Sequence, residues 1–138
     1  MSADAPSRGG DQPAAPAGLG FPRAARLLKH ADFERVYKQG RRHFSSHMTV
    51  FYLRQSDGAG SGSARVGFTV GRVLGGAVVR NRIKRRLREA IRLRRAALDA
   101  AVDVVINPKK SILTLEFAAV VEEMRRAFEV IAKRLVEK

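Results

Sequence analysis

The side chains best suited to chemistry in this chain are cations, and they are concentrated between residues 80 and 95. Nine of these sixteen positions are Lys or Arg, and Glu89 is the single acid among them. At about 100° per residue, one side of a helix here would be apolar and a neighbouring side cationic. The cationic side would carry Lys84, Arg85, Arg88, Arg92 and Arg95. Guanidinium groups suit phosphate oxygens, and an ordinary solvated face mixes both signs of charge, so the pattern favours nucleic-acid binding.

Side chains that commonly perform catalysis are not grouped in this sequence. The thirteen acids are scattered apart from Glu122-Glu123, whereas nucleases that hydrolyse phosphodiesters unaided usually cluster carboxylates around metal ions. His30, His43 and His47 lack the spacing of a helical metal pair, and there is no cysteine to form a disulfide or a thiolate metal site. We therefore expect no catalytic residue and no metal site in the protein itself.

The overall composition points to the same class of partner. A chain of 138 residues suits one domain, and its net charge of +14 indicates a polyanion, either nucleic acid or an anionic membrane. No apolar run is long enough to span a bilayer, and no secretory signal opens the chain. A peripheral membrane protein is the weaker alternative, because the apolar stripe consists of Ile, Leu and Ala, which suits a protein core. The absence of a membrane-spanning run, of a secretory signal and of cysteine favours a cytoplasmic location.

The N-terminal half of the chain is expected to contain a tail, a short helix and two or three strands. Residues 1–20 are rich in Ala, Gly, Pro and Ser and are expected to be a disordered tail, followed by a single RNA-binding domain over residues 21–138. The pattern predicts a short helix over 32–39 that ends at Gly40, and a strand over 47–54. Residues 42–44 either begin this strand or form a short one. A flexible loop over 55–63 leads to a strand over 65–70, expected to pair antiparallel with the first.

The C-terminal half supplies the basic helix and its support. A glycine-bearing connection over 71–76 leads into the basic helix at about 77–97. A strand over 102–106 is expected to stop at Asn107-Pro108, and a long amphipathic helix over about 115–136 is expected to have Thr114 as its N-cap. The order is helix, two or three strands, basic helix, strand, helix. It predicts an α/β sandwich in which helices pack against a small mixed sheet.

Three aromatic residues have two possible roles. Phe33 and Tyr37 lie four apart on the first helix, and Phe51 shares a strand face with His47 and Thr49. Aromatic residues at helical spacing are usually core, but mixed aromatic and polar faces also stack unpaired bases. The residues alone leave both roles open.

The segment Arg80-Asn81-Arg82-Ile83-Lys84-Arg85, with Arg88 after it, resembles the Arg-Asn-Arg signature of the bacterial ribonuclease P protein component. Other segments resemble that family in the same order over about residues 21–136. They are Asp32-Phe33 with Val36-Tyr37 and Gly40, then Arg65 to Val70, then Gly75 with Ala77-Val78-Val79, and then Val104-Val105-Ile106 with Pro108.

The resemblance implies a fold and a function. The fold is α-β-β-β-α-β-α, like the second domain of ribosomal protein S5, with an unusual left-handed β-α-β crossover through the basic helix. The implied function is that of an accessory subunit: it binds a catalytic RNA and the 5′ leader of precursor tRNA, and the holoenzyme removes that leader. Cleavage then belongs to the RNA and its Mg²⁺ ions.

The resemblance also assigns residues to these two roles. By resemblance, the catalytic RNA is contacted by Arg80, Asn81, Arg82, Lys84, Arg85 and Arg88. A central cleft for the single-stranded leader is expected to contain Phe33, Tyr37, Phe51, Thr69 and Arg72.

This sequence departs from the family pattern near the basic helix. Gly71-Arg72-Val73 stands where the family usually has Ser-Lys-Lys, and Gly76 stands where it often has Asn. A metal-binding loop proposed for the family would lie near 55–63, where Asp57 is the single acid, so that site is not carried over. The alternative function is a ribosomal or general structured-RNA-binding protein without a processing role.

Overall fold

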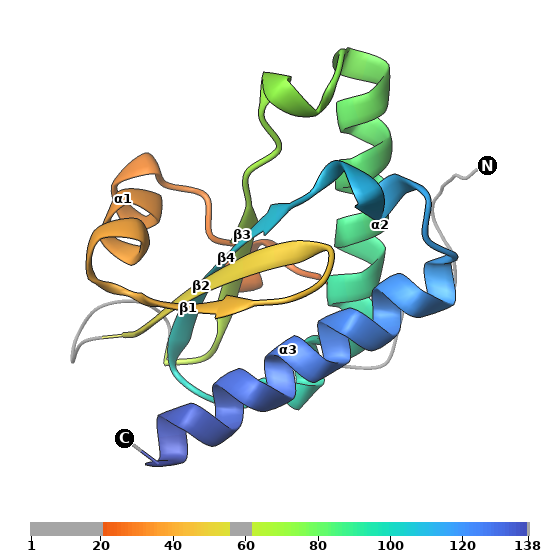
Figure 1. Cartoon of the computed structure of the whole chain (residues 1–138). Coiled ribbons are helices and arrows are strands. Elements are labelled where there is room, and N and C mark those ends of the chain that lie inside the picture. Colours follow the sequence, from red (N-terminus) through yellow and green to blue (C-terminus); the bar gives the residue numbers. More distant parts are fainter. Residues whose placement is uncertain (1–20, 56–61, 138) are drawn as a thin grey trace.

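Residues 21–55 and 62–137 are described in the computed structural model, in which three helices pack on a four-stranded sheet (Figure 1). The helices are α1 (His30–Gln39), α2 (Ala77–Arg94) and α3 (Phe117–Glu137). The strands are β1 (Arg41–Phe44), β2 (Met48–Arg54), β3 (Arg65–Phe68) and β4 (Val102–Pro108). Short 3-10 helices cover 23–25, 72–74, 95–97 and 110–113. The element order confirms the predicted α-β-β-β-α-β-α fold, whereas the expected tail over 1–20 lies outside the described residues.

The order of the strands in the sheet is β1-β2-β4-β3. β2 pairs antiparallel with both β1 and β4, while β3 pairs parallel with β4, so the sheet is mixed. The expected antiparallel pairing of residues 47–54 with 65–70 is therefore wrong, because β4 lies between these strands. The physical reason is burial: residues 102–106 are buried without interruption, which suits a central strand covered on both faces.

Alternation along β2 separates the two faces of the sheet. Met48, Val50 and Tyr52 are buried beneath α2 and α3, whereas Thr49 and Phe51 are half-buried on the face that α1 covers. The larger core joins this strand to both long helices. A smaller cluster under α1 has Leu27, Val36 and Val105 at its centre, with Phe33, Tyr37, Phe51 and Leu53 packed against it.

Several predicted boundaries change in the structure. Residues 41–44 form a strand of their own, and β4 continues through Asn107 and Pro108, which pair with Thr49 and Met48. Thr114 does not cap α3, because its hydroxyl donates to the carbonyl of Ser111 at 3.0 Å and the helix begins at Phe117. The predicted helix over 77–97 is α-helical to Arg94 and 3-10 over its last three residues.

Gly40 ends α1 because of a close backbone approach and not because of its own backbone conformation. Its φ of −81° is open to any residue, so no left-handed conformation is required. A Cβ at this position would lie 2.5 Å from the carbonyl oxygen of Val36 and 2.6 Å from that of Tyr52. Glycine is therefore needed because β2 passes very close to the end of the helix.

Candidate nucleic-acid interface

Helix α2 presents the basic residues because its opposite stripe is fixed in the core. Ile83, Leu87, Ala90 and Ile91 are fully buried. The helix starts after Gly75, whose φ of 143° is a conformation that residues with a side chain rarely adopt. Glycine therefore permits the turn that leads into α2.

The six predicted residues of α2 all reach its surface, and we call them the α2 basic face: Arg80, Asn81, Arg82, Lys84, Arg85 and Arg88. Asn81, Arg82, Arg85 and Arg88 are exposed, and the other two are half-buried. Arg80 donates its Nε–H to the carbonyl of Gly75 at 3.2 Å. Within the described residues, none of the five cations on this face forms an ion pair with an acid. The charge of the face is therefore available to an external anion.

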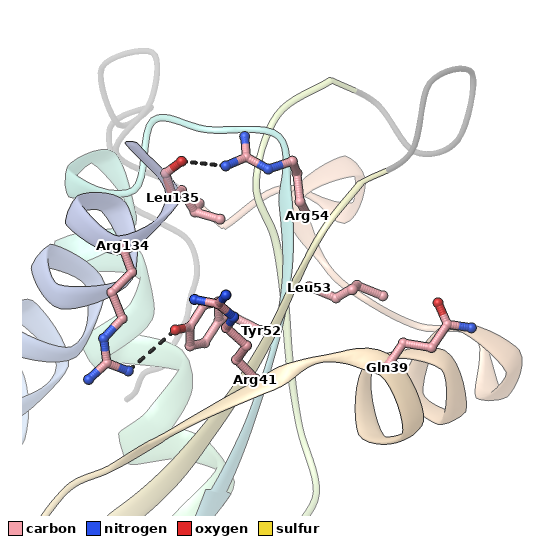
Figure 2. A pocket seen from close by; sticks show the side chains of 7 residues that line it. All are labelled: Gln39, Arg41, Tyr52, Leu53, Arg54, Arg134 and Leu135. Carbon is pink, nitrogen blue, oxygen red and sulfur yellow. Dashed lines mark hydrogen bonds between the residues drawn. The ribbon is translucent and has the colours of Figure 1, made fainter. Parts of the chain in front are cut away.

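Other arginines of the same chain have structural partners. Arg86 donates to the carbonyl of Ile112 at 3.0 Å. At the far end of β2, a cavity of about 400 Å³ contains Arg54 and Arg134 (Figure 2). Arg54 donates to the carbonyl of Leu135, and Arg134 donates to the hydroxyl of Tyr52 at 3.3 Å, so both hold the end of α3 against β2. The α2 basic face contrasts with these fixed arginines.

Three of the five predicted leader-binding residues lie together beside α1. The ring of Tyr37 stands edge-on to that of Phe51, with centroids 4.9 Å apart and an interplanar angle of 88°. The Tyr37 hydroxyl donates to Oδ1 of Asn107 at 2.9 Å, so its 2.7 Å contact with Oγ1 of Thr69 leaves the threonine hydroxyl as donor. The guanidinium carbon of Arg42 lies 5.3 Å from the centroid of Phe51. We define the Tyr37 cluster as Tyr37, Phe51, Thr69, Asn107 and Arg42.

Phe33 and Arg72, the other two predicted residues, are placed differently. Phe33 packs into the same apolar cluster, but its ring lies over Gly67, where an added Cβ would come within 2.6 Å of it. Arg72 is exposed in the 3-10 helix that precedes α2. Arg42 and Asn107 were not identified from the sequence. Both could have been found from the strand register, in which Arg42 pairs with Phe51 and Asn107 with Thr49.

A buried charge network holds α1 over the sheet and so positions Tyr37. Asp103, which is 1% exposed, accepts from Arg65 through both carboxylate oxygens, at 2.9 and 2.7 Å. It also accepts from Arg35 of α1 at 3.3 Å, and Arg35 donates to Asp32 at 2.9 Å. The hydrogen bonds that Arg65 donates to Asp103 raise the pKa of Arg65 above its ordinary value. Asp103 interrupts a run of valines, and that signal could have revealed the network from sequence.

One half of the adjacent acidic pair has a structural role. Glu123, half of the adjacent acidic pair, accepts from the hydroxyl of Ser45 at 2.5 Å and from the backbone N–H of His47 at 2.8 Å, which ties the β1–β2 turn to α3. No group of three or more His, Cys, Asp or Glu within residues 21–55 and 62–137 is placed to hold a metal ion. In the same part of the chain, no helix combines the length and apolarity needed to cross a bilayer.

The chain is similar to one family of known proteins. A family model described as Ribonuclease P matches residues 21–132. The chain belongs to the ribonuclease P protein family. A ribonuclease P protein component from Dictyoglomus thermophilum is 37% identical over 79% of this chain and 89% of that protein. The corresponding component from Gluconacetobacter diazotrophicus is 42% identical over 75% of this chain and 88% of that protein.

A solved structure of a protein from this family is also similar to the chain. The structure of the Staphylococcus aureus RNase P protein has a TM-score of 0.67 and 25% identity, over 79% of this chain and 96% of that one. Val73, where the resemblance leads us to expect Lys, is 93% exposed beside Arg72 and presents an uncharged side chain to solvent.

Proposed function

We propose that this ribonuclease P protein binds the catalytic RNA of ribonuclease P through the α2 basic face. We also propose that it binds the 5′ leader of precursor tRNA through the Tyr37 cluster, and that it thereby promotes endonucleolytic removal of the leader. In this proposal the protein is an accessory subunit. The RNA subunit performs the cleavage with Mg²⁺ ions, and the holoenzyme acts in the cytoplasm.

The observation that carries the proposal is the unpaired charge of the α2 basic face. Each of its cations can neutralise a phosphate and release a counterion, which favours association with a polyanion and depends strongly on salt. The core-facing stripe of α2 keeps these side chains on a rigid element, so binding RNA does not require the helix to fold first.

The Tyr37 cluster supports the second half of the proposal. It combines one aromatic pair with a guanidinium group and with hydrogen-bonding side chains, and its members are half-buried or exposed rather than enclosed. Such a surface can stack an unpaired base and contact its backbone, which suits single-stranded RNA better than a duplex. Phe33, which packs into the same apolar cluster as Tyr37 and Phe51, and the exposed Arg72 are further candidates for leader binding.

Reconstitution tests the proposal. The protein is combined with the catalytic RNA of ribonuclease P from the same organism, at a magnesium concentration too low for that RNA to act alone. We expect the leader to be removed from precursor tRNA when both are present, and the precursor to stay uncut with the protein alone. Cleavage by ribonuclease-treated protein alone would contradict the assignment of chemistry to the RNA. Failure of the complete mixture would favour the alternative of a general structured-RNA binder.

A further inference from the structure

A groove runs between the N-terminal segment of the described chain and α2. It consists of two cavities, of about 290 and 550 Å³. Phe21, Arg26 and Arg88 line both of them, so the cavities adjoin. Phe68 and Lys84 line the smaller one, and Arg85 and Arg92 the larger. We call this the Phe21 groove. It lies along the α2 basic face but includes Phe21, Arg26 and Phe68, which no comparison or sequence pattern assigned to binding.

Two arginines, Arg26 and Arg88, line both cavities of the Phe21 groove. Partial desolvation lowers the pKa of Arg88, although much of its side chain is exposed, and the positive charge of Arg26 lowers that pKa further. Neither arginine forms an ion pair with an acid of the described residues. Glu89, the acid that lines the larger cavity, is paired with Arg92, whose Nε donates to it at 3.1 Å. An anion between Arg26 and Arg88 would relieve their repulsion.

Aromatic rings accompany these cations. The guanidinium carbon of Arg26 lies 5.2 Å from the ring centroid of Phe21, and its Nε donates to the carbonyl of Phe21 at 3.0 Å. The guanidinium carbon of Arg88 lies 5.8 Å from the ring centroid of Phe68. Each arginine is therefore within reach of an aromatic face. The groove thus offers apolar rings to a planar group and two guanidinium groups to a phosphate.

We propose that the Phe21 groove binds one unstacked nucleotide of an RNA strand. Its base lies against Phe21 and Phe68, and its phosphate lies between Arg26 and Arg88. The smaller cavity, close to the lower end of the roughly 300–1,000 Å³ typical of ligand sites, suits one nucleoside and excludes a duplex. RNA is favoured over an acidic peptide because the groove is continuous with the α2 basic face, and in this respect the inference rests on the proposed function. The strand belongs either to the catalytic RNA or to precursor tRNA.

Matched variants of the full chain separate this site from general charge. Arg26→Gln removes a groove cation, and Arg23→Gln removes an exposed cation three residues earlier that does not line the groove. Phe21→Leu removes a ring, and Phe21→Tyr keeps it. Melting temperatures identify any variant that loses the fold. Three sets of affinities are then measured. The free protein is tested for its affinity for an unstructured single-stranded oligoadenylate and for the catalytic RNA. The reconstituted holoenzyme is tested for its affinity for precursor tRNA and for mature tRNA.

We expect Phe21→Leu to weaken oligoadenylate binding by about 5- to 150-fold, the range of one lost stack, and Phe21→Tyr to restore it. Arg26→Gln should weaken binding and reduce its salt slope by somewhat less than one unit, beyond any effect of Arg23→Gln. A parallel loss with the catalytic RNA identifies that source of the nucleotide, whereas a loss confined to precursor tRNA identifies the leader.

The inference is overturned if Arg26→Gln matches Arg23→Gln and Phe21→Leu matches the unmodified protein in all three measurements. It is also overturned if Phe21→Tyr is as weak as Phe21→Leu, because the ring would then not be the binding element. Binding of oligoadenylate by the groove does not depend on leader removal. A failed reconstitution with an intact effect on oligoadenylate would therefore reject the proposed function and leave the groove.

Discussion

At the scale of single residues, Asp103 has the clearest structural consequence. Its carboxylate is bound by Arg65 and Arg35 beneath α1, and these side chains are 17% and 36% exposed. Asp103→Asn should destabilise the protein by about 3 kcal/mol, near the lower end of the cost of breaking a buried pair, because water can still reach Arg35. Urea unfolding measures this change. The control Glu129→Gln, at an exposed ion pair of α3, should change stability by less than about 0.5 kcal/mol, and equal effects would contradict the network.

The environment of His43 predicts the sign of one pH dependence of stability. Burial lowers the pKa of His43, the positive charge of Arg134 lowers it further, and Glu123 opposes both. Below its ordinary pKa of 6.5, the unfolded chain takes up a proton that the folded chain resists. The contribution of His43 to the free energy of unfolding is therefore fully present above pH 6.5, and it decreases as the pH drops towards the pKa of the folded state. Unfolding free energies measured from pH 7.5 downward should fall less steeply for His43→Gln, and an unchanged slope would contradict this.

At the scale of elements, α2 carries the proposed RNA contact. Replacing Arg82 and Arg85 together by Gln should leave the fold intact, because both are exposed, and should reduce the slope of log affinity against log salt for the catalytic RNA by about 1.5. The matched control replaces Arg125 and Arg126 of α3, which are paired with acids of their own helix. If both double variants lower the slope equally, α2 has no special part in binding.

Sequence patterns predicted the elements better than their pairing. Helical and strand periodicity reflects which face is buried, and therefore gave α2, α3 and β2 close to their observed bounds. The position of β4 between β2 and β3 depends on long-range packing, which local periodicity does not contain. The same limit applies to the site. Tyr37 and Phe51 were candidates from the residues themselves and Thr69 from the resemblance, whereas Arg42 and Asn107 required the strand register.

At the scale of the whole molecule, the net charge of +14 opposes compaction. A multivalent anion that binds the folded cations should therefore stabilise the fold by mass action. We expect pyrophosphate to raise the melting temperature more than sodium chloride at equal ionic strength, since simple screening is then matched. Equal effects of the two salts would contradict specific anion binding by the folded protein.

The central claim is that the chain uses two different surfaces for RNA, and Phe51 tests it most directly. Phe51 is half-buried beside Tyr37, so Phe51→Ala should retain the fold, as its melting temperature would show. In the reconstituted holoenzyme, affinity for precursor tRNA should fall by about 1–3 kcal/mol for the lost stack. Affinity for mature tRNA, which has no leader, should stay the same.

The decisive measurement is the ratio of precursor to mature tRNA affinity in the Phe51→Ala holoenzyme. We expect this ratio to fall towards one while affinity for the catalytic RNA is unchanged. A preserved ratio in a folded variant would contradict it, because the Tyr37 cluster would then not bind the leader.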